Sequence, residues 1–91
     1  MYAVVANARI EPGRAEDATE HLQSTVVPRV KEVPGVVSGH WTRSSDGEHG
    51  TAMVVFESED AARAAAEQVP NMAPEYVHFD SIEVLEVVAQ L

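Results

Sequence analysis

The chain has 91 residues and no cysteine, and fifteen acidic residues against six basic ones give it a formal net charge of −9. The length allows one hydrophobic core, so residues 1–91 are expected to form a single domain. The lack of cysteine excludes disulfides, thiolate metal sites and cysteine nucleophiles. The negative charge opposes binding to nucleic acids and to anionic membranes, and neither is expected as a partner.

The apolar content points to a folded domain with a cytoplasmic location. Hydrophobic residues make up 45% of the chain, which is enough for a packed core. No apolar run reaches the length of a membrane span, and residues 1–10 lack the basic and apolar regions of a signal peptide. A cytoplasmic protein is therefore expected.

The first third of the chain predicts a strand and a helix. Residues 2–10 are rich in valine and alanine and end at a Glu-Pro-Gly turn, which is typical of a strand. Residues 14–33 place apolar side chains at helical spacing and stop at a Pro-Gly pair. Pro28 lies inside this helix, so a kink is expected over residues 24–28.

The rest of the chain predicts a hairpin, a second helix and a last strand. Alternating patterns, an Asp-Gly turn and an N-terminal serine cap support these elements. The expected bounds are a strand over 36–44, a turn over 45–50, a strand over 51–57, a helix from Ser58 to about Val69 that ends at Pro70, and a strand over 79–89.

The resulting β-α-β-β-α-β order predicts an α+β fold of the ferredoxin-like type. Its antiparallel sheet has both helices on one face. The strands, however, carry apolar side chains on both faces: Val4 and Ala6 point one way in the first strand, and Ala3 and Val5 the other. An uncovered apolar face needs a partner, and a second copy of the chain is the simplest one. A homodimer is therefore expected.

Several polar residues within the strands are candidates for a site. Asn7 stands among apolar neighbours, and a buried amide needs either a protein partner or a ligand for its hydrogen bonds. Arg9 lies on the same side, where it either orients an anionic ligand or pairs with an acidic residue. His40 and Trp41 are adjacent in a strand, so they point to opposite faces.

The other candidates lie on the first helix and near the last strand. His21 borders the apolar stripe of the helix, and Tyr76 and His78 lie where a loop meets the strand, a position that often borders a pocket. Packing or solvation is the alternative explanation for each of these residues. The four histidines show no metal-ligand spacing, and no phosphate loop is present, so no metal or cofactor is expected.

Four segments together suggest a family. They are Arg9–Arg14 (RIEPGR), Val33–Val37 (VPGVV), Val54–Ser58 (VVFES) and Asp60–Ala62 (DAA). In this order and spacing, over roughly the first three quarters of the chain, they resemble the dimeric α/β-barrel superfamily and, within it, the antibiotic biosynthesis monooxygenase-like domains.

The resemblance implies a homodimer whose two sheets close into a β-barrel, with a pocket between helices and sheet in each subunit. Some members of the superfamily oxygenate aromatic quinols without metal or flavin, and others degrade haem using an Asn, a Trp and a His. Asn7 matches the first-strand Asn. Phe56 stands where the haem-degrading members have Trp, and the second helix has no His, so haem degradation is not expected.

The sequence thus predicts a cofactor-independent monooxygenase that acts on a small aromatic or polyketide-like molecule of the quinol or anthrone type. The candidate catalytic residues are Asn7, His40 and His78. The candidate substrate-binding residues are Trp41, Phe56, His21, Tyr76 and Arg9. The alternative is a non-catalytic dimeric domain that binds a small ligand or serves as an accessory domain, in which Asn7 is structural. A cavity lined by convergent polar groups favours the enzyme, and a filled core favours the alternative.

Overall fold

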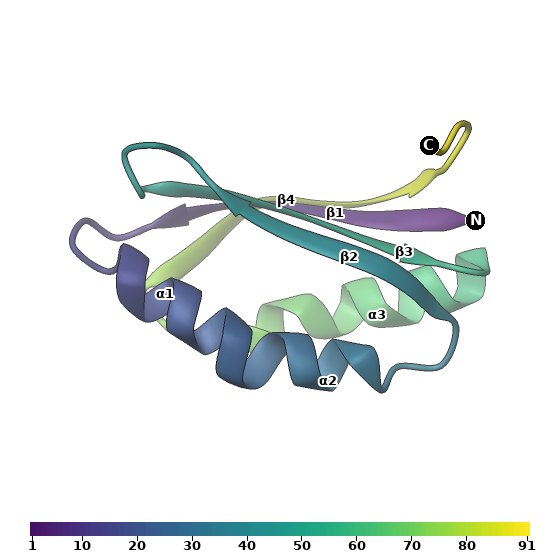
Figure 1. Cartoon of the computed structure of the whole chain (residues 1–91), viewed down its shortest axis with the longest axis horizontal. Helices are drawn as coiled ribbons and strands as arrows, with labels where there is room; N and C mark the ends of the chain where they lie inside the picture. The colour runs from purple at the N-terminus through teal and green to yellow at the C-terminus, as the bar shows by residue number, and fades with distance from the viewer.

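The computed structural model describes residues 1–91 as a four-stranded antiparallel sheet with helices on one face (Figure 1). The strands are β1 (Tyr2–Ile10), β2 (Val36–Arg43), β3 (His49–Phe56) and β4 (Val77–Glu86), in the spatial order β2-β3-β1-β4. The helices are α1 (Ala15–His21), α2 (Val27–Lys31) and α3 (Glu59–Met72). The predicted ferredoxin-like α+β fold is confirmed.

The first helix is continuous but irregular. Between α1 and α2 the chain forms a π-helical segment, η1 (Leu22–Val26). Pro28 follows at the start of α2 and has no N–H to donate to the carbonyl one turn earlier. A widened turn next to a proline is a known way to accommodate this lost hydrogen bond. Where a kink was expected, over residues 24–28, the structure has a π-helical segment that overlaps this range.

Two predicted boundaries were wrong. The second helix does not end at Pro70 but continues to Met72 with Pro70 inside it. The fixed φ of proline is itself helical, so near a helix end its cost is small enough for the helix to continue. The last strand spans Val77–Glu86 rather than 79–89, because it pairs along β1 from Ile10 to Tyr2.

The β2–β3 hairpin turns at the predicted Asp-Gly pair. Gly47 has a φ of 75°, which favours glycine, and the Asp46 carboxylate accepts hydrogen bonds from the Ser44 hydroxyl and from the Glu48 N–H. The turn also packs on α1, since a Cβ at Gly47 would lie 2.9 Å from the Cβ of Ala15.

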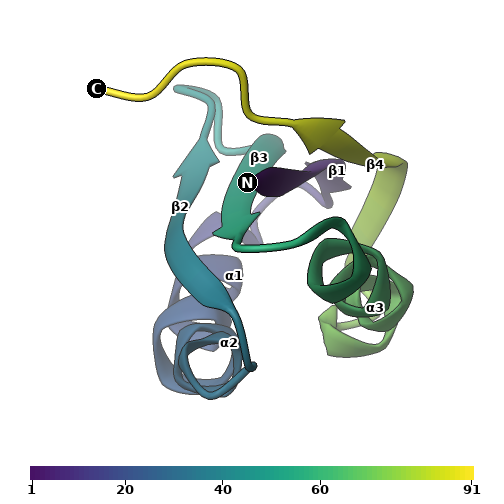
Figure 2. The same ribbon diagram turned by 90° about the vertical axis from the view of Figure 1, so that its right-hand side faces the viewer.

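Alternate residues of each strand divide the sheet into two faces. On the helix-covered face, Val4 of β1 lies between Val54 of β3 and Val84 of β4. The main core forms here, from Val4, Val54, Phe56 and Ala62, with Phe56 only 1% exposed. The first helix (α1–η1–α2) and α3 lie side by side beneath this face (Figure 2).

The opposite face, called the open face below, is not apolar throughout as expected. Its apolar side chains gather at the end where β1 begins, and they are Ala3, Val5, Met53, Val55 and Leu85. Further along, the strands present Asn7, Thr51 and Ser81, and the polar residues His40 of β2 and Glu83 of β4 lie level with Met53 and Val5. The expectation failed because β4 ends at Glu86, so the apolar residues after it do not extend this face.

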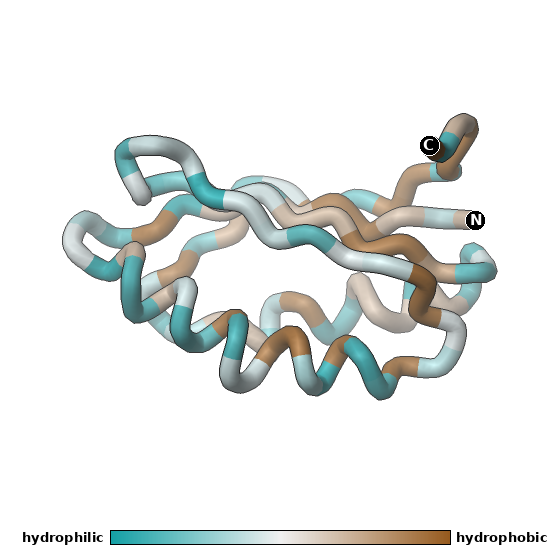
Figure 3. The backbone as a smooth tube through the Cα atoms, in the orientation of Figure 1, coloured by the Kyte–Doolittle hydropathy of each residue, from teal (hydrophilic) through white to brown (hydrophobic).

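The C-terminal segment, residues 87–91, leaves the sheet on the side of the open face (Figure 3). The Val87 N–H donates to the Met1 carbonyl and so extends the pairing with the N-terminus by one hydrogen bond. Beyond it, Val88 and Leu91 are fully exposed apolar side chains. No helix in the fold has the length and hydrophobicity that crossing a membrane requires.

Candidate functional site

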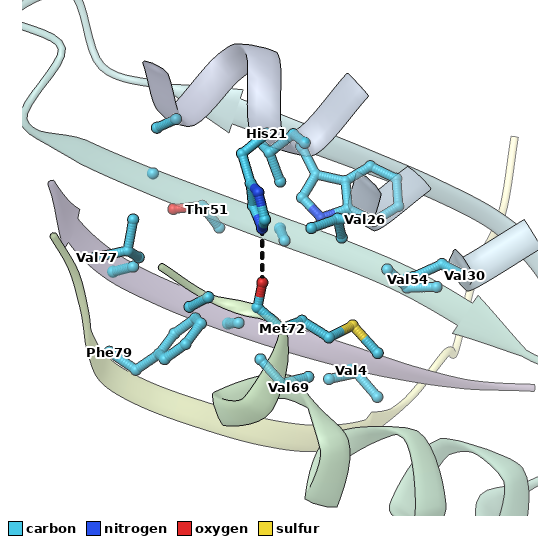
Figure 4. Close-up of a pocket in the computed structure, with 18 of the residues that line it drawn as sticks. Val4, His21, Val26, Val30, Thr51, Val54, Val69, Met72, Val77 and Phe79 are labelled. Atoms are coloured by element: carbon cyan, nitrogen blue, oxygen red, sulfur yellow. Dashed lines mark hydrogen bonds between the residues drawn. The ribbon is translucent and has the colours of Figure 1, made fainter. Parts of the chain in front are cut away.

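A cavity of about 340 Å³ lies between the helices and the helix-covered face of the sheet. It is lined by 28 residues, 20 of them hydrophobic, from all four strands, the first helix (α1–η1–α2) and α3. Figure 4 draws part of this lining. This volume lies within the range typical of small-molecule sites, which are mostly apolar with a few polar groups. The cavity is therefore the candidate functional site.

The cavity exists because small residues stand on its walls. The sheet contributes Ala6, Ala8, Gly50 and Ala52, and α3 contributes Ala65. Larger side chains at these positions would fill the space, as protein interiors normally do. The serine cap at Ser58 starts α3 and fixes the direction in which its alanine face leaves the sheet.

His21 connects α1 to α3 across the cavity. Its Nε2 lies 2.9 Å from the main-chain carbonyl of Met72, the last residue of α3 (Figure 4). A carbonyl oxygen only accepts hydrogen bonds, so Nε2 must carry the proton and donate it. In the neutral ring the remaining nitrogen, Nδ1, then keeps a lone pair and can act as a base. His21 is thus both a link between helices and a titratable group in the cavity wall.

Trp41 is the large aromatic residue of the cavity and lies in β2, opposite Ala52 of β3. Its ring extends back over Gly39, where a Cβ would lie 3.0 Å from two ring carbons. Glycine at position 39 therefore makes room for the indole. Phe56, at the end of β3, adds a second aromatic ring to the lining.

One end of the cavity is polar. Arg43, the last residue of β2, donates from Nη1 to Glu16 Oε1 and to Thr19 Oγ1, both at 3.1 Å. Arg43 and Thr19 line the cavity, whereas Glu16 does not. The cavity therefore combines an apolar interior with a cationic, half-exposed end.

Three of the predicted site residues line the cavity: His21, Trp41 and Phe56. They come from α1, β2 and β3, and the fold brings them together.

Asn7 is not among the lining residues, because it belongs to the open face. There its Nδ2 donates to Ser81 Oγ at 3.1 Å, and its Oδ1 accepts from Thr51 Oγ1 at 2.8 Å. The hydrogen bonds of its amide are thus made across three strands. Asn7 therefore lies outside this cavity, and its amide already has hydrogen-bond partners within the sheet.

The remaining candidates also lie away from the cavity. His40 is exposed on the open face, opposite Met53. His78 contacts the Glu11 carboxylate at 2.9 Å, and Arg9 pairs with Asp80 at 2.8 Å, so both have acidic partners on the protein. Strand alternation explains these placements, because each residue lies one position away from a cavity-facing neighbour.

Tyr76 is buried in a second, smaller core with Ile10 and Ala18. The Arg14 guanidinium stacks on its ring at 3.9 Å from the ring centre. Tyr76 does not line the cavity, although its core partners Ile10 and Ala18 do.

Sequence reasoning missed Arg43. The signal was present, because Arg43 follows Trp41 by two positions in the same strand and so shares its face. Arg43 follows directly from the placement of Trp41, whereas the link between His21 and Met72 depends on how two helices pack and has no local signal.

The chain is thus an α+β domain with an antiparallel ferredoxin-like sheet and a mostly apolar cavity between the sheet and its helices. The model of the antibiotic biosynthesis monooxygenase family matches residues 1–71, and the chain belongs to this family. No protein with a curated description matches the chain.

Solved structures share the fold at low sequence identity. HapK from Hahella chejuensis is 15% identical with a TM-score of 0.77, and the match covers 99% of this chain and 95% of HapK. The monooxygenase of the gene ActVA-Orf6 from Streptomyces coelicolor, solved with the ligand Nanaomycin D, is 17% identical with a TM-score of 0.68, covering 99% and 89%. NE2512 from Nitrosomonas europaea, a protein of unknown function, is 18% identical with a TM-score of 0.71, covering 99% and 91%.

Proposed function

We propose that this protein is a monooxygenase that oxidises a small aromatic or polyketide-like molecule, of the quinol or anthrone type, in the cavity beneath its sheet. The observation that carries the proposal is the apolar cavity of about 340 Å³ with Trp41, Phe56 and His21 in its lining. Membership of the antibiotic biosynthesis monooxygenase family supports the reaction type. The rings of such a substrate suit aromatic walls, and its ionisable oxygen or carbon suits a nearby base.

The proposed reaction uses O₂ as the oxidant and no bound cofactor. A base takes one proton from the substrate, and the resulting electron-rich anion gives electrons to O₂ and forms one new C–O bond. The hydroperoxide then loses water, so a CH₂ group and O₂ become a carbonyl group and H₂O. In this scheme Nδ1 of His21 takes the proton, and the apolar walls of the cavity exclude bulk water.

A second candidate is a binding domain without catalysis. The observation in its favour is that Nε2 of His21 is already engaged with the Met72 carbonyl, which gives the histidine a structural role between helices. In that case the cavity binds an aromatic ligand and releases it unchanged.

Oxygen uptake distinguishes the two candidates. Chelator-treated protein is mixed with anthrone, and O₂ consumption is compared for the wild type, His21→Gln and the control variant His40→Gln. We expect catalysed uptake in the wild type and in His40→Gln, and a loss of tenfold or more in His21→Gln, the size of effect that removal of a general base produces. Uptake at the uncatalysed rate in all three proteins would contradict the monooxygenase and leave the binding domain.

We also propose that two copies pair through their open faces. The apolar end of that face, with Met53 47% and Leu85 45% exposed, and the exposed apolar side chains of residues 87–91 support this. A stable interface buries on the order of 1,000 Å² or more of surface, so the open face and the C-terminal segment would both have to take part. Val84, in contrast, lies on the helix-covered face, so a substitution there would test folding instead of assembly.

Sedimentation at low micromolar concentration tests the pairing. The wild type is expected at twice the mass of the chain, and Met53→Asp at the mass of one chain with unchanged helical content, because an unpaired carboxylate in the interface is costly. A wild-type protein that sediments as a folded single chain would contradict the dimer.

A further inference from the structure

The charges of the molecule are distributed unevenly around the cavity. The chain has fifteen acidic residues, yet none of them lines the cavity. Among the six lysines and arginines, Arg43 is the one that does. A protein with a net charge of −9 thus presents a cavity whose one fully charged lining group is a cation.

Arg43 has unused hydrogen-bonding capacity. Its two bonds, to Glu16 and Thr19, both come from Nη1, and the structure gives Nε and Nη2 no protein partner. A guanidinium has five N–H donors and can donate two parallel hydrogen bonds to one carboxylate. The N–H groups left free on Arg43 can therefore donate hydrogen bonds to an anionic oxygen at the polar end of the cavity.

The partner that holds Arg43 at present is easily displaced. The Glu16 side chain is 86% exposed and that of Arg43 is 45% exposed. Ion pairs at such exposed positions contribute little, because water and salt screen them and ordering the side chains costs entropy. Thr19 lies in the cavity wall and can keep its bond to Arg43 when Glu16 leaves.

We propose that Arg43 determines specificity by binding an acidic group of an aromatic ligand, and that Glu16 is the internal anion which this group replaces. The inference rests on the proposed function in taking the cavity as the ligand site. It adds the chemical class: an aromatic anion whose rings lie among the apolar walls and whose charged oxygen stays at the half-exposed end. An unpaired charge deeper in the apolar interior would be strongly unfavourable, so the charge also fixes the orientation of the ligand.

Two probes that share a ring system test the proposal by calorimetric titration. The probe 1-naphthoate carries the anion, and 1-naphthalenemethanol is its neutral counterpart; neither needs to be oxidised, so binding is separated from catalysis. The wild type is expected to bind naphthoate between about threefold and tenfold more tightly than the alcohol, the effect of a half-exposed charge-assisted contact. This preference should decrease as salt is added.

Variants of the ion pair have opposite expected effects. Arg43→Gln should remove the preference for naphthoate while the alcohol still binds, and Arg43→Lys should restore part of it. Glu16→Gln should strengthen naphthoate binding about twofold to threefold, because the competing carboxylate is gone. The matched control is Arg63→Gln, an exposed arginine that pairs with Glu59 on α3 and does not line the cavity; it should leave both affinities unchanged.

Equal affinities for the two probes in the wild type, or an Arg43→Gln variant that keeps the preference, would overturn the role of Arg43 while the aromatic cavity stands. If neither probe binds the wild type, the cavity is not an aromatic site, and the proposed function fails with this inference.

Discussion

On the helix-covered face, β1 presents Val4, Ala6 and Ala8 to a cavity, whereas on the open face the same strand presents Asn7 and Arg9. The first set leaves a space of about 340 Å³ between the sheet and the helices. The second set satisfies its polar groups with residues of the neighbouring strands. The two faces differ because successive residues of one strand point in opposite directions. A polar residue in a strand is therefore evidence for a site only when its face is known.

The histidines show the same contrast. His21 lies in the cavity wall with one nitrogen engaged by a carbonyl, whereas His40 is exposed on the other side of the sheet. From the sequence, His40 is a catalytic candidate and His21 a substrate-binding one. The fold places only His21 in the cavity wall, because adjacency along a strand separates the side chains of His40 and Trp41.

The largest expected effect on stability is at Phe56, and Met53, on the opposite face of β3, is its comparison. Phe56 is 1% exposed in the main core, and Met53 is 47% exposed on the open face. Phe56→Ala should lower the free energy of unfolding by about 3–5 kcal/mol, a large part of the total stability of a small domain. Met53→Ala should cost less than about 1 kcal/mol within a single chain. Urea unfolding of both variants checks this, and equal losses would contradict the assignment of faces.

A smaller effect is expected at Gly39, on the cavity side. An added Cβ would lie 3.0 Å from the Trp41 ring, so Gly39→Ala should displace the indole at a cost of about 1–3 kcal/mol. Trp41 is the single tryptophan of the chain, so its fluorescence spectrum reports the displacement directly. The adjacent substitution Ser38→Ala, on the open face, is the control, and an unchanged spectrum in Gly39→Ala would contradict the placement of the ring.

The substitution Asn7→Ala tests whether a polar residue of the open face affects stability but not binding in the cavity. The variant loses the hydrogen bonds to Ser81 and Thr51 and should be destabilised by about 1 kcal/mol. Ligand binding in the cavity should be unchanged, because Asn7 faces away from it. Thermal unfolding and the naphthoate titration measure the two quantities. A loss of binding without a loss of stability would return Asn7 to the site.

The smallest expected effect on stability is at the hairpin turn between β2 and β3. The hydroxyl of Ser44, and then the N–H of Glu48, hold the pKa of the Asp46 carboxyl below its usual value. A lowered pKa in the folded state stabilises the protein above the unfolded pKa, and this contribution disappears as the pH falls through the folded pKa. Asp46→Asn should therefore be less stable than the wild type at pH 6, with the difference shrinking toward pH 3. A difference that does not depend on pH would contradict this account.

The fold could be predicted from the sequence because its signals are local. The apolar patterns, the Asp46-Gly47 turn and the serine cap at Ser58 each act within a few residues. The end of α3 was predicted wrongly because Pro70 was taken to end the helix. The fixed φ of proline is itself helical, so the helix continues past it. The bounds of β4 were missed because its partner β1, which lies far away in the sequence, determines them through the pairs Ile10–Val77 and Tyr2–Glu86.

The candidate site could be predicted only in part. Trp41 and Phe56 stand out as aromatic residues in strands, and both line the cavity. His21 borders the apolar stripe of its helix and Arg43 shares the face of Trp41, so both positions have a local signal. The contacts of His21 with Met72 and of Arg43 with Thr19 depend on packing between separate elements, which no local pattern encodes. Asn7 attracted attention as a polar residue in a strand, but the hydroxyls that satisfy its amide come from two other strands. The register that joins them is a property of the whole sheet.

The most direct test of the account is where a ligand binds. Two-dimensional NMR of the protein titrated with 1-naphthoate reports on both faces of the sheet in one experiment. The account predicts shifts at the Trp41 indole N–H, the His21 ring and the amide of Ala65, with the Asn7 side-chain amide and the His40 ring unchanged. Shifts concentrated at Asn7 and His40, with the Trp41 and His21 signals unmoved, would show that the open face carries the site and would contradict the account.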